Sequence, residues 1–207
     1  IAGYELEHFS LDHLNGGCLL FQLLERSEDV RYRIAIATLR EQYRHHPRNS
    51  AGGFWHNGTM TNQMLLDGTY MGAPFYAECG RAENDPAAID DALRQIFLLA
   101  EHNRDARTGL FHQGWDETGT QAWADPRTGC SASFWGRTTG WYAMAMADLL
   151  DIISAGHAGR AELAGVFKGL LEALARVQDH ASGLWWNVLD QGARENNYIE
   201  ASASLMF

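Results

Sequence analysis

The chain has 207 residues, enough for one ordinary domain, and 46% of them are hydrophobic, which suffices for a buried core. Its formal net charge of −10 at pH 7 argues against nucleic acid or an anionic membrane as the main partner, because both require a basic surface. The three cysteines lie far apart without a C-x-x-C motif, so neither a disulfide framework nor a zinc site is expected. No apolar run approaches the roughly 20 residues of a membrane span.

Two helices are predicted in the first 50 residues. Apolar side chains recur at helical spacing over residues 12–25 and again over 29–44. Ser10 or Asp12 lies where the first helix needs a cap, and Pro47 follows the second helix as a stop signal. The second pattern is the more amphipathic, which is typical of a helix that covers a more apolar one.

The third predicted helix contains a carboxylate in an apolar setting. The helix follows a Gly-rich loop over residues 50–58, is capped by Thr61 or Asn62, and ends at Gly80. Asp67 lies one to two turns inside it, where burying a carboxylate is costly unless it is hydrogen-bonded or faces a wet cavity. Two interpretations stay open: a core Asp bonded to its neighbours, or a proton-transfer acid whose pKa is raised by an apolar wall.

Helices and long loops alternate through the rest of the chain. Three further helices are predicted, over residues 85–102, 137–155 and 161–179, and a last one begins after residue 198. The loops between them, over 104–136 and 180–198, are rich in Gly, Trp and Asp. A loop this long inside a compact helical domain is usually functional.

A weak internal repeat relates the loops to the helices that follow them. It comprises Gly53-Phe54-Trp55-His56, Gly109-Leu110-Phe111-His112 and Gly183-Leu184-Trp185-Trp186. The repeating unit is a loop, an apolar inner helix and an amphipathic outer helix, and such hairpins stack with their loops at one end. All seven tryptophans lie in these loops or just after one, where they either cap the hairpins or stack on sugar rings.

Five ordered segments resemble one enzyme family. They are HNGTMTNQMLLDGTYMGAPFYAE, TGLFHQGWDET, WADPRTG, FWGRTTGWYAMAMADLLD and NNYIEASASLMF. With Asp12-His13-Leu14-Asn15, which is similar to the family's Asp-His-Ile/Val-Asn segment, they resemble the unsaturated rhamnogalacturonyl hydrolases, glycoside hydrolase family 105. The resemblance implies an all-α fold, an (α/α)6 barrel of six helical hairpins in a ring. Residues 1–207 are then expected to be a single catalytic domain, a fragment of the barrel truncated at both ends.

The resemblance implies a hydrolysis that begins at a double bond. Family members act on sugar chains that a lyase has left with a 4,5-unsaturated galacturonic acid at the non-reducing end. A carboxylic acid protonates C4, water adds at C5, and the product opens and releases the next sugar, usually rhamnose. The expected ligand is a small anionic oligosaccharide, and neither a metal nor another cofactor is expected.

Site residues follow from the resemblance position by position. Asp67 corresponds to the acid/base aspartate, and Asp12 to a second aspartate that orients water or substrate hydroxyls. Arg137 corresponds to a residue able to pair with the substrate carboxylate, while Trp135 and Trp141 flank the flat ring. From the residues alone, Asp12 is equally typical of a helix N-cap, and Arg137 of a helix-start residue paired with a nearby aspartate.

One position departs from the family pattern. The family commonly has Phe-Tyr-His-Gly-Trp where this chain has Phe111-His112-Gln113-Gly114-Trp115, so Gln113 stands in place of the active-site His. Glutamine donates hydrogen bonds but carries no charge at neutral pH. Either His112 moves into the site, or Gln113 suffices because the aspartate transfers the proton, or activity is reduced. His56 and Trp115 are further candidates for substrate contact.

Several other functions stay open. An ordinary inverting glycosidase needs two carboxylates about 6.5–9.5 Å apart, which Asp67 with Asp12, Asp116 or Asp125 could supply. An unsaturated glucuronyl hydrolase or another uronyl-oligosaccharide hydrolase on the same fold is a second alternative. A sugar-binding relative without activity is a third, which Gln113 favours. The expected location is cytoplasmic, and the sequence leaves the oligomeric state open.

Overall fold

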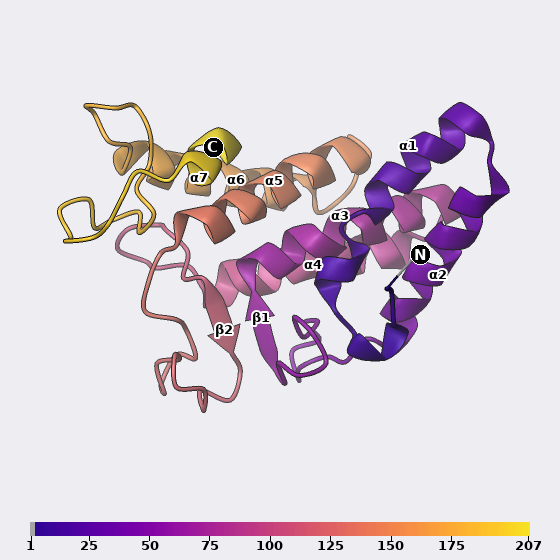
Figure 1. Cartoon of the computed structure of the whole chain (residues 1–207), viewed down its shortest axis with the longest axis horizontal. Helices are drawn as coiled ribbons and strands as arrows, with labels where there is room; N and C mark the ends of the chain where they lie inside the picture. The colour runs from indigo at the N-terminus through magenta and orange to yellow at the C-terminus, as the bar shows by residue number, and fades with distance from the viewer. Residues whose placement is uncertain (1–2) are drawn as a thin grey trace.

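A computed structural model describes residues 3–207 of the chain. Figure 1 shows helices joined by long loops, with a short two-stranded sheet near one end of the helices. The helices are α1 (Gly17–Ser27), α2 (Val30–His45), α3 (Leu66–Glu83), α4 (Pro86–His102), α5 (Gly136–Ile152), α6 (Arg160–Arg176) and α7 (Ala201–Met206). The strands are β1 (Gln63–Leu65) and β2 (Gly114–Asp116), and two 3-10 turns, η1 (Leu6–His8) and η2 (Leu11–Leu14), precede α1.

The helices pack as successive hairpins. The odd-numbered helices α1, α3, α5 and α7 contact one another in chain order, and α2, α4 and α6 each pack against the helix before them. Figure 1 shows the same arrangement, with α1 and α2 at one end of the arc and α7 at the other. The repeating unit of a loop, an inner helix and an outer helix is therefore present as predicted.

Two clusters of buried side chains hold the hairpins together. The larger joins α3 to α6 and includes Tyr142, whose hydroxyl donates a hydrogen bond of 2.8 Å to the Ile96 carbonyl oxygen. The smaller joins α1 and α2 to α3, where Tyr43 donates 2.7 Å to the Gly72 carbonyl oxygen and its ring packs near Phe75. Each buried phenol thus has a partner, which removes the penalty for burying it.

Helix starts agree with the predictions where a cap is encoded locally. The Asp29 carboxylate accepts a hydrogen bond from the Arg31 amide, and α2 begins at Val30. The Asp85 carboxylate accepts from Ala87 and Ala88, and α4 begins with Pro86 at its first position. Helices α5 and α6 begin within one residue of the prediction and end three residues earlier than predicted.

The predicted bounds of the helix that contains Asp67 are wrong at both ends. Residues 63–65 pair with β2, with Leu65 opposite Gly114, so α3 begins only at Leu66 and Asp67 is its second residue. At the other end α3 continues to Glu83, and Asn84 takes the left-handed conformation. Gly80 therefore lies inside the helix, and a glycine is needed there because a Cβ would be 2.9 Å from the Asp85 carbonyl oxygen.

The predicted helix over residues 12–25 is also divided. Residues 11–14 form η2, and α1 begins at Gly17. No side chain caps either element, so the predicted N-cap role of Asp12 is wrong. A Cβ at Gly17 would be 2.4 Å from the Phe75 ring, which explains why a glycine opens α1.

One turn recurs through the long loops. In each copy an Asp carboxylate accepts from the backbone amide three residues later, and the following glycine donates to the carbonyl oxygen of that Asp. The three copies are Asp105–Gly109, Asp125–Gly129 and Asp179–Gly183, with glycine φ values of 75°, 74° and 72°. Glycine is required there because this backbone conformation is costly for other residues.

Candidate active site

Asp67 lies at the point where β1 passes into α3. The Leu66 amide donates a hydrogen bond of 3.0 Å to the Gln113 carbonyl oxygen, which anchors the first turn of the helix beside β2. The Asp67 side chain is half-buried, and among the described residues only the Gly68 amide donates to it, at 3.1 Å. It is therefore not tied up as a core aspartate with several partners would be.

The proton affinity of Asp67 reflects opposing effects. Burial raises the pKa of Asp67 above its ordinary value, the charge of His56 opposes that rise, and the charge of Asp12 reinforces it. The position at the helix N-terminus favours the ionised form, yet burial outweighs it. A half-buried carboxyl with a raised pKa and free lone pairs is suited to donate a proton.

Asp12 and His56 meet beside this carboxyl. Asp12 lies on η2 with its side chain 57% exposed, and its Oδ2 is 3.7 Å from Nε2 of His56, whose side chain is 8% exposed. The Leu11 amide donates 3.1 Å to the His56 carbonyl oxygen, so η2 and the loop that contains His56 are held together. The structure thus brings Asp12, His56 and Asp67 into one cluster from three separate segments.

Gln113 and His112 are placed differently. The Gln113 backbone bonds to Leu66 on one side and to the Ser133 carbonyl oxygen on the other, so it joins the start of α3 to the segment before α5. The His112 ring packs at 4.7 Å from the Phe134 ring, and it lines a separate hollow of about 450 Å³. The Gln113 backbone is therefore joined to the first turn of α3, whereas the His112 ring packs on Phe134.

Aromatic side chains and an arginine surround the start of α5. Trp135 precedes the helix, and its indole N–H donates 2.7 Å to Oδ1 of Asn187. The exposed Arg137 guanidinium lies 4.2 Å from the centre of the Trp135 ring, and no carboxylate pairs with it in residues 3–207. Trp141 stacks on Tyr70 of α3 at 4.8 Å, which carries the aromatic wall toward the helix that contains Asp67.

Two residues considered in the sequence are used for packing. Trp115 is 5% exposed and stacks on His102 at 3.7 Å, so its ring is not available to a substrate at the surface. The Asp116 carboxylate is buried and accepts hydrogen bonds from Thr118, Thr120 and Gln121. Burial raises the pKa of Asp116, but these bonds outweigh it and lower the pKa, so Asp116 is not suited to be a general acid.

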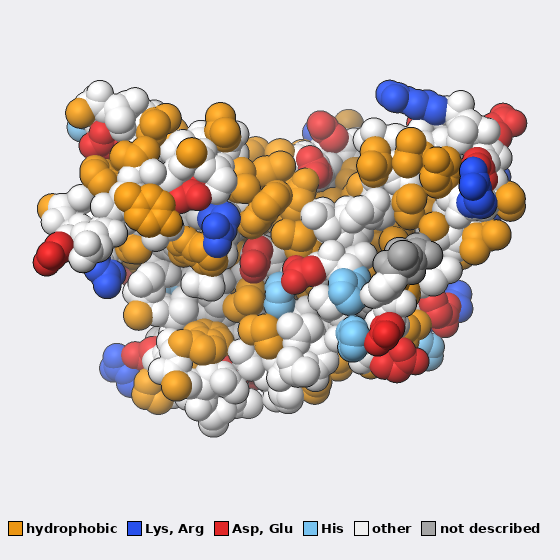
Figure 2. Space-filling model, viewed as in Figure 1, with side chains coloured by type: hydrophobic (Ala, Val, Ile, Leu, Met, Phe, Trp, Pro, Cys, Tyr) orange, Lys and Arg blue, Asp and Glu red, His pale blue; other side chains and the backbone are white. Residues whose placement is uncertain are grey.

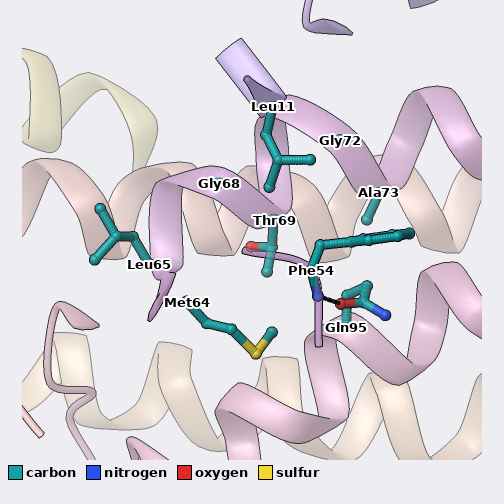
Figure 3. Close-up of a pocket in the computed structure, with 9 residues that line it drawn as sticks. All are labelled: Leu11, Phe54, Met64, Leu65, Gly68, Thr69, Gly72, Ala73 and Gln95. Atoms are coloured by element: carbon teal, nitrogen blue, oxygen red, sulfur yellow. Dashed lines mark hydrogen bonds between the residues drawn. The ribbon is translucent and has the colours of Figure 1, made fainter. Parts of the chain in front are cut away.

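Two hollows are lined by residues that neighbour the cluster in sequence. A hollow of about 580 Å³, which we call the outer hollow, is lined among others by Phe9, His13, Trp55 and Asn57. The loop tryptophan and the Asp12-His13 segment are its signals in the sequence, whereas no sequence pattern indicated residues 7–10. A second, enclosed cavity of about 10 Å³ lies behind α3, between Leu11, Phe54, Met64 and Gly68 (Figure 3), and has room for no more than a water molecule.

Figure 2 shows acidic and histidine side chains gathered near the middle of one face, beside hydrophobic side chains. Within residues 3–207 no group of three or more His, Cys, Asp or Glu is arranged to hold a metal ion. In the same part of the chain, no helix combines the length and apolar character needed to cross a bilayer.

The chain matches known proteins along its length. The model of Glycosyl Hydrolase Family 88 matches residues 2–207. A solved glycoside hydrolase of family 105 from C. acetobutylicum is 40% identical with a TM-score of 0.97, over 100% of this chain and 57% of that chain. The predicted all-α class and (α/α)6 barrel are thereby confirmed.

Two curated relatives are also similar. The 24.9 kDa protein in the picA locus of Rhizobium radiobacter is 42% identical over 137 residues, 66% of this chain and 58% of that protein. The unsaturated rhamnogalacturonyl hydrolase YesR of Bacillus subtilis is 32% identical over 142 residues, 69% of this chain and 38% of that protein. The chain thus spans little more than half the length of the first of these relatives and of the solved structure.

Proposed function

Since the chain belongs to Glycosyl Hydrolase Family 88 and is similar to a solved family 105 enzyme, we propose that it removes a 4,5-unsaturated galacturonyl residue from rhamnogalacturonan fragments. The likeness to YesR supports the choice of substrate. The single observation that carries the proposal is the half-buried Asp67 carboxyl, raised in pKa and bound by one backbone amide, beside Asp12 and an aromatic wall.

In this proposal Asp67 acts as both acid and base. Its proton moves to C4, where the electron pair of the C4=C5 bond forms the new C–H bond, and the ring oxygen stabilises the positive charge at C5. Water then adds its oxygen to C5 and returns a proton to Asp67. The ring oxygen leaves C5 as a ketone forms, and the resulting hemiacetal at C1 releases the next sugar.

The exposed Asp12 carboxylate is proposed to hold the attacking water. It lies beside the same His56 that influences Asp67, and its side chain is open to solvent, where a water can reach it. Such an orienting role requires a hydrogen-bond acceptor that water can reach.

The arginine and the aromatic side chains are proposed to bind the substrate. Arg137 has no carboxylate partner among the described residues, so its guanidinium is free to pair with the uronate. Trp135 and Trp141 then flank the flat unsaturated ring. The outer hollow, beside Asp12 and His56, is proposed to receive the sugar that is released.

Gln113 is proposed to replace the family histidine as an uncharged hydrogen-bond donor. It adjoins the first turn of α3, whereas His112 packs on Phe134. The proton transfer itself then depends on Asp67, and the substitution affects binding of the substrate more than the chemical step.

The test follows the absorbance of the C=C bond during incubation of the full-length protein with the unsaturated rhamnogalacturonan disaccharide. We expect the ultraviolet absorbance to fall as the double bond is hydrated, with no cleavage of the saturated disaccharide. Cleavage of the saturated sugar would identify an ordinary glycosidase instead, and binding without loss of absorbance would identify a sugar-binding relative. An unsaturated glucuronyl disaccharide, tested in parallel, distinguishes the two uronyl specificities.

A further inference from the structure

We propose that His56 and Gly68 act together as positioning residues. Because Gly68 has no side chain, the His56 imidazole packs against the helix there, beside Asp12 and Asp67. The position of the imidazole then determines how the two carboxylates lie relative to each other. This inference rests on the proposed function, in which both aspartates take part. It assigns His56 a role that acts through the aspartates, in place of the substrate contact that the sequence suggested.

The first observation is the close approach at Gly68. A Cβ on this residue would lie 2.7 Å from Nδ1 of His56 and 3.2 Å from Cδ1 of Leu11. One turn later, a Cβ on Gly72 would lie 3.1 Å from Cδ2 of Leu11. Figure 3 shows the Leu11 side chain beside this part of α3. Because Gly68 and Gly72 have no side chains, both η2 and the His56 loop can reach the backbone of α3 next to Asp67.

The second observation is the confinement of the imidazole. The His56 side chain is 8% exposed, and its Nδ1 has no hydrogen-bond partner among residues 3–207. The His56 amide donates 2.9 Å to the Gln63 carbonyl oxygen, and its own carbonyl oxygen accepts from Leu11. Both backbone groups are thus used, so the backbone that carries the ring is held beside η2 and the first turn of α3.

A buried imidazole with one unpaired nitrogen carries a desolvation cost, so its presence needs an explanation. Here its other nitrogen lies 3.7 Å from Asp12, and Gly68 is the residue after Asp67. The same ring therefore adjoins the two segments that contain the aspartates.

The titratable groups around His56 come from three parts of the chain. Asp12 approaches from η2 and Asp67 from α3, while His46 lies just after α2. Burial lowers the pKa of His46 to about 4, so His46 is neutral at working pH. The carboxylates are then the charged neighbours that respond to His56, and displacing the ring removes the influence that keeps the Asp67 pKa from rising further.

Gly68→Ala tests this inference, with Gly165→Ala on α6 as the matched control. A Cβ at Gly165 meets nothing within 4 Å, so the control changes a helical glycine without a collision. For Gly68→Ala we expect kcat on the unsaturated disaccharide to fall by at least about tenfold with KM changed less than about threefold. We also expect the alkaline limb of the pH profile of kcat to move to higher pH, because Asp67 keeps its proton longer.

Combination with His56→Ala separates positioning from simple helix packing. If the Cβ acts by displacing the imidazole, Gly68→Ala should cause little further loss once the imidazole is gone. His56→Ala alone should shift the alkaline limb in the same direction. The inference would be overturned if Gly68→Ala lowered kcat as much in the His56→Ala background as in the wild type. It would also be overturned if Gly68→Ala lowered kcat without moving the alkaline limb.

The readout also distinguishes this inference from the proposed function. If the wild-type protein does not consume the disaccharide, the proposed function fails, and the positioning role is then measured by NMR titration of the Asp67 carboxyl. Both Gly68→Ala and His56→Ala should raise its midpoint, whereas Gly165→Ala should not. Identical midpoints in all variants would exclude the positioning role.

Discussion

At the scale of single residues, the central feature is a carboxyl group kept partly out of water at the start of a helix. The helix N-terminus and His56 favour the ionised form of Asp67, whereas burial and Asp12 favour the protonated form, and burial is the largest of these effects. An acid catalyst requires this balance, because a fully solvated aspartate is ionised at neutral pH.

The first prediction concerns Asp67→Asn in the full-length enzyme. Asparagine keeps the shape of the side chain but cannot transfer a proton, so we expect kcat to fall by at least about a hundredfold with the fold intact. Turnover of the unsaturated disaccharide and circular dichroism measure the two parts. Near-normal turnover would remove Asp67 from the mechanism.

The same variant has an expected effect on stability. Because the folded-state pKa of Asp67 is raised, the wild-type fold loses stability as pH rises from the unfolded value, near 3.9, through the folded value. We expect Asp67→Asn to have a higher Tm than wild type near neutral pH and the difference to shrink below about pH 4. Equal Tm values at pH 7 would show that burial does not penalise the carboxylate.

Arg137→Ala tests the proposed carboxylate clamp. The guanidinium is exposed and lies over Trp135, so its removal should leave the Tm almost unchanged. We expect KM for the anionic disaccharide to rise by at least about tenfold, since a charge-assisted pair is lost. Arg107→Ala, at another exposed loop arginine, is the control, and an unchanged KM in Arg137→Ala would contradict the clamp.

At the scale of elements, the long loops are held by hydrogen bonds of their own, as the helices are. Turns that begin with Asp and end with Gly stabilise the loop backbone, and the buried Asp116 carboxylate collects donors from Thr118, Thr120 and Gln121. These bonds stabilise the loop between β2 and α5. The Gln113 amide, just before β2, donates to the Ser133 carbonyl oxygen and so joins the two ends of this loop. A site assembled from loops needs such internal support.

Asp116→Ala is expected to destabilise this loop strongly. Its removal leaves several backbone amides without an acceptor and should lower the free energy of unfolding by about 3 kcal/mol. Asp125→Ala, in an exposed turn, is the matched control and should cost about 1 kcal/mol or less. Denaturant unfolding measures both losses. Equal losses of unfolding free energy in the two variants would mean that burial does not strengthen the contribution of the hydrogen bonds at Asp116.

At the scale of the whole molecule, the hairpins form an arc whose ends carry exposed apolar side chains. Leu19, Val30 and Ile34 are at least 55% exposed on α1 and α2, and Leu205 is 89% exposed on α7. Figure 1 shows these helices at opposite ends of the arc. That the chain is a fragment of a longer ring stays a prediction, and such a ring would cover both ends.

Leu205 and Leu163 provide a matched pair for this arrangement in the 207-residue chain. Leu163 is fully buried, so Leu163→Ala should lower the free energy of unfolding by about 2–5 kcal/mol. Leu205→Ala should change it by less than about 0.5 kcal/mol, because the side chain is already in water. A large effect at Leu205 would show that it is covered in solution, for example by a second copy.

Much of the fold could be predicted because its signals are local. The caps Asp29 and Asp85 lie next to the helices they begin, and helical periodicity shows which face of each helix is apolar. The repeat predicted stacked hairpins, and the resemblance carried by the ordered motifs predicted the barrel and the family. The residues around Asp67 singled out a carboxylate in an apolar setting.

Only the tertiary structure decided where these groups lie. Asp67 is at the helix start because β1 pairs with a strand about 50 residues away, and Trp115 and Asp116 are buried for the same reason. The bond between the Gln113 carbonyl oxygen and the Leu66 amide follows from that pairing, and the close approach of His56 to Gly68 follows from the docking of η2 on α3. Periodicity and caps report interactions within a few residues, whereas these placements depend on contacts between distant segments, whose partners no local pattern names.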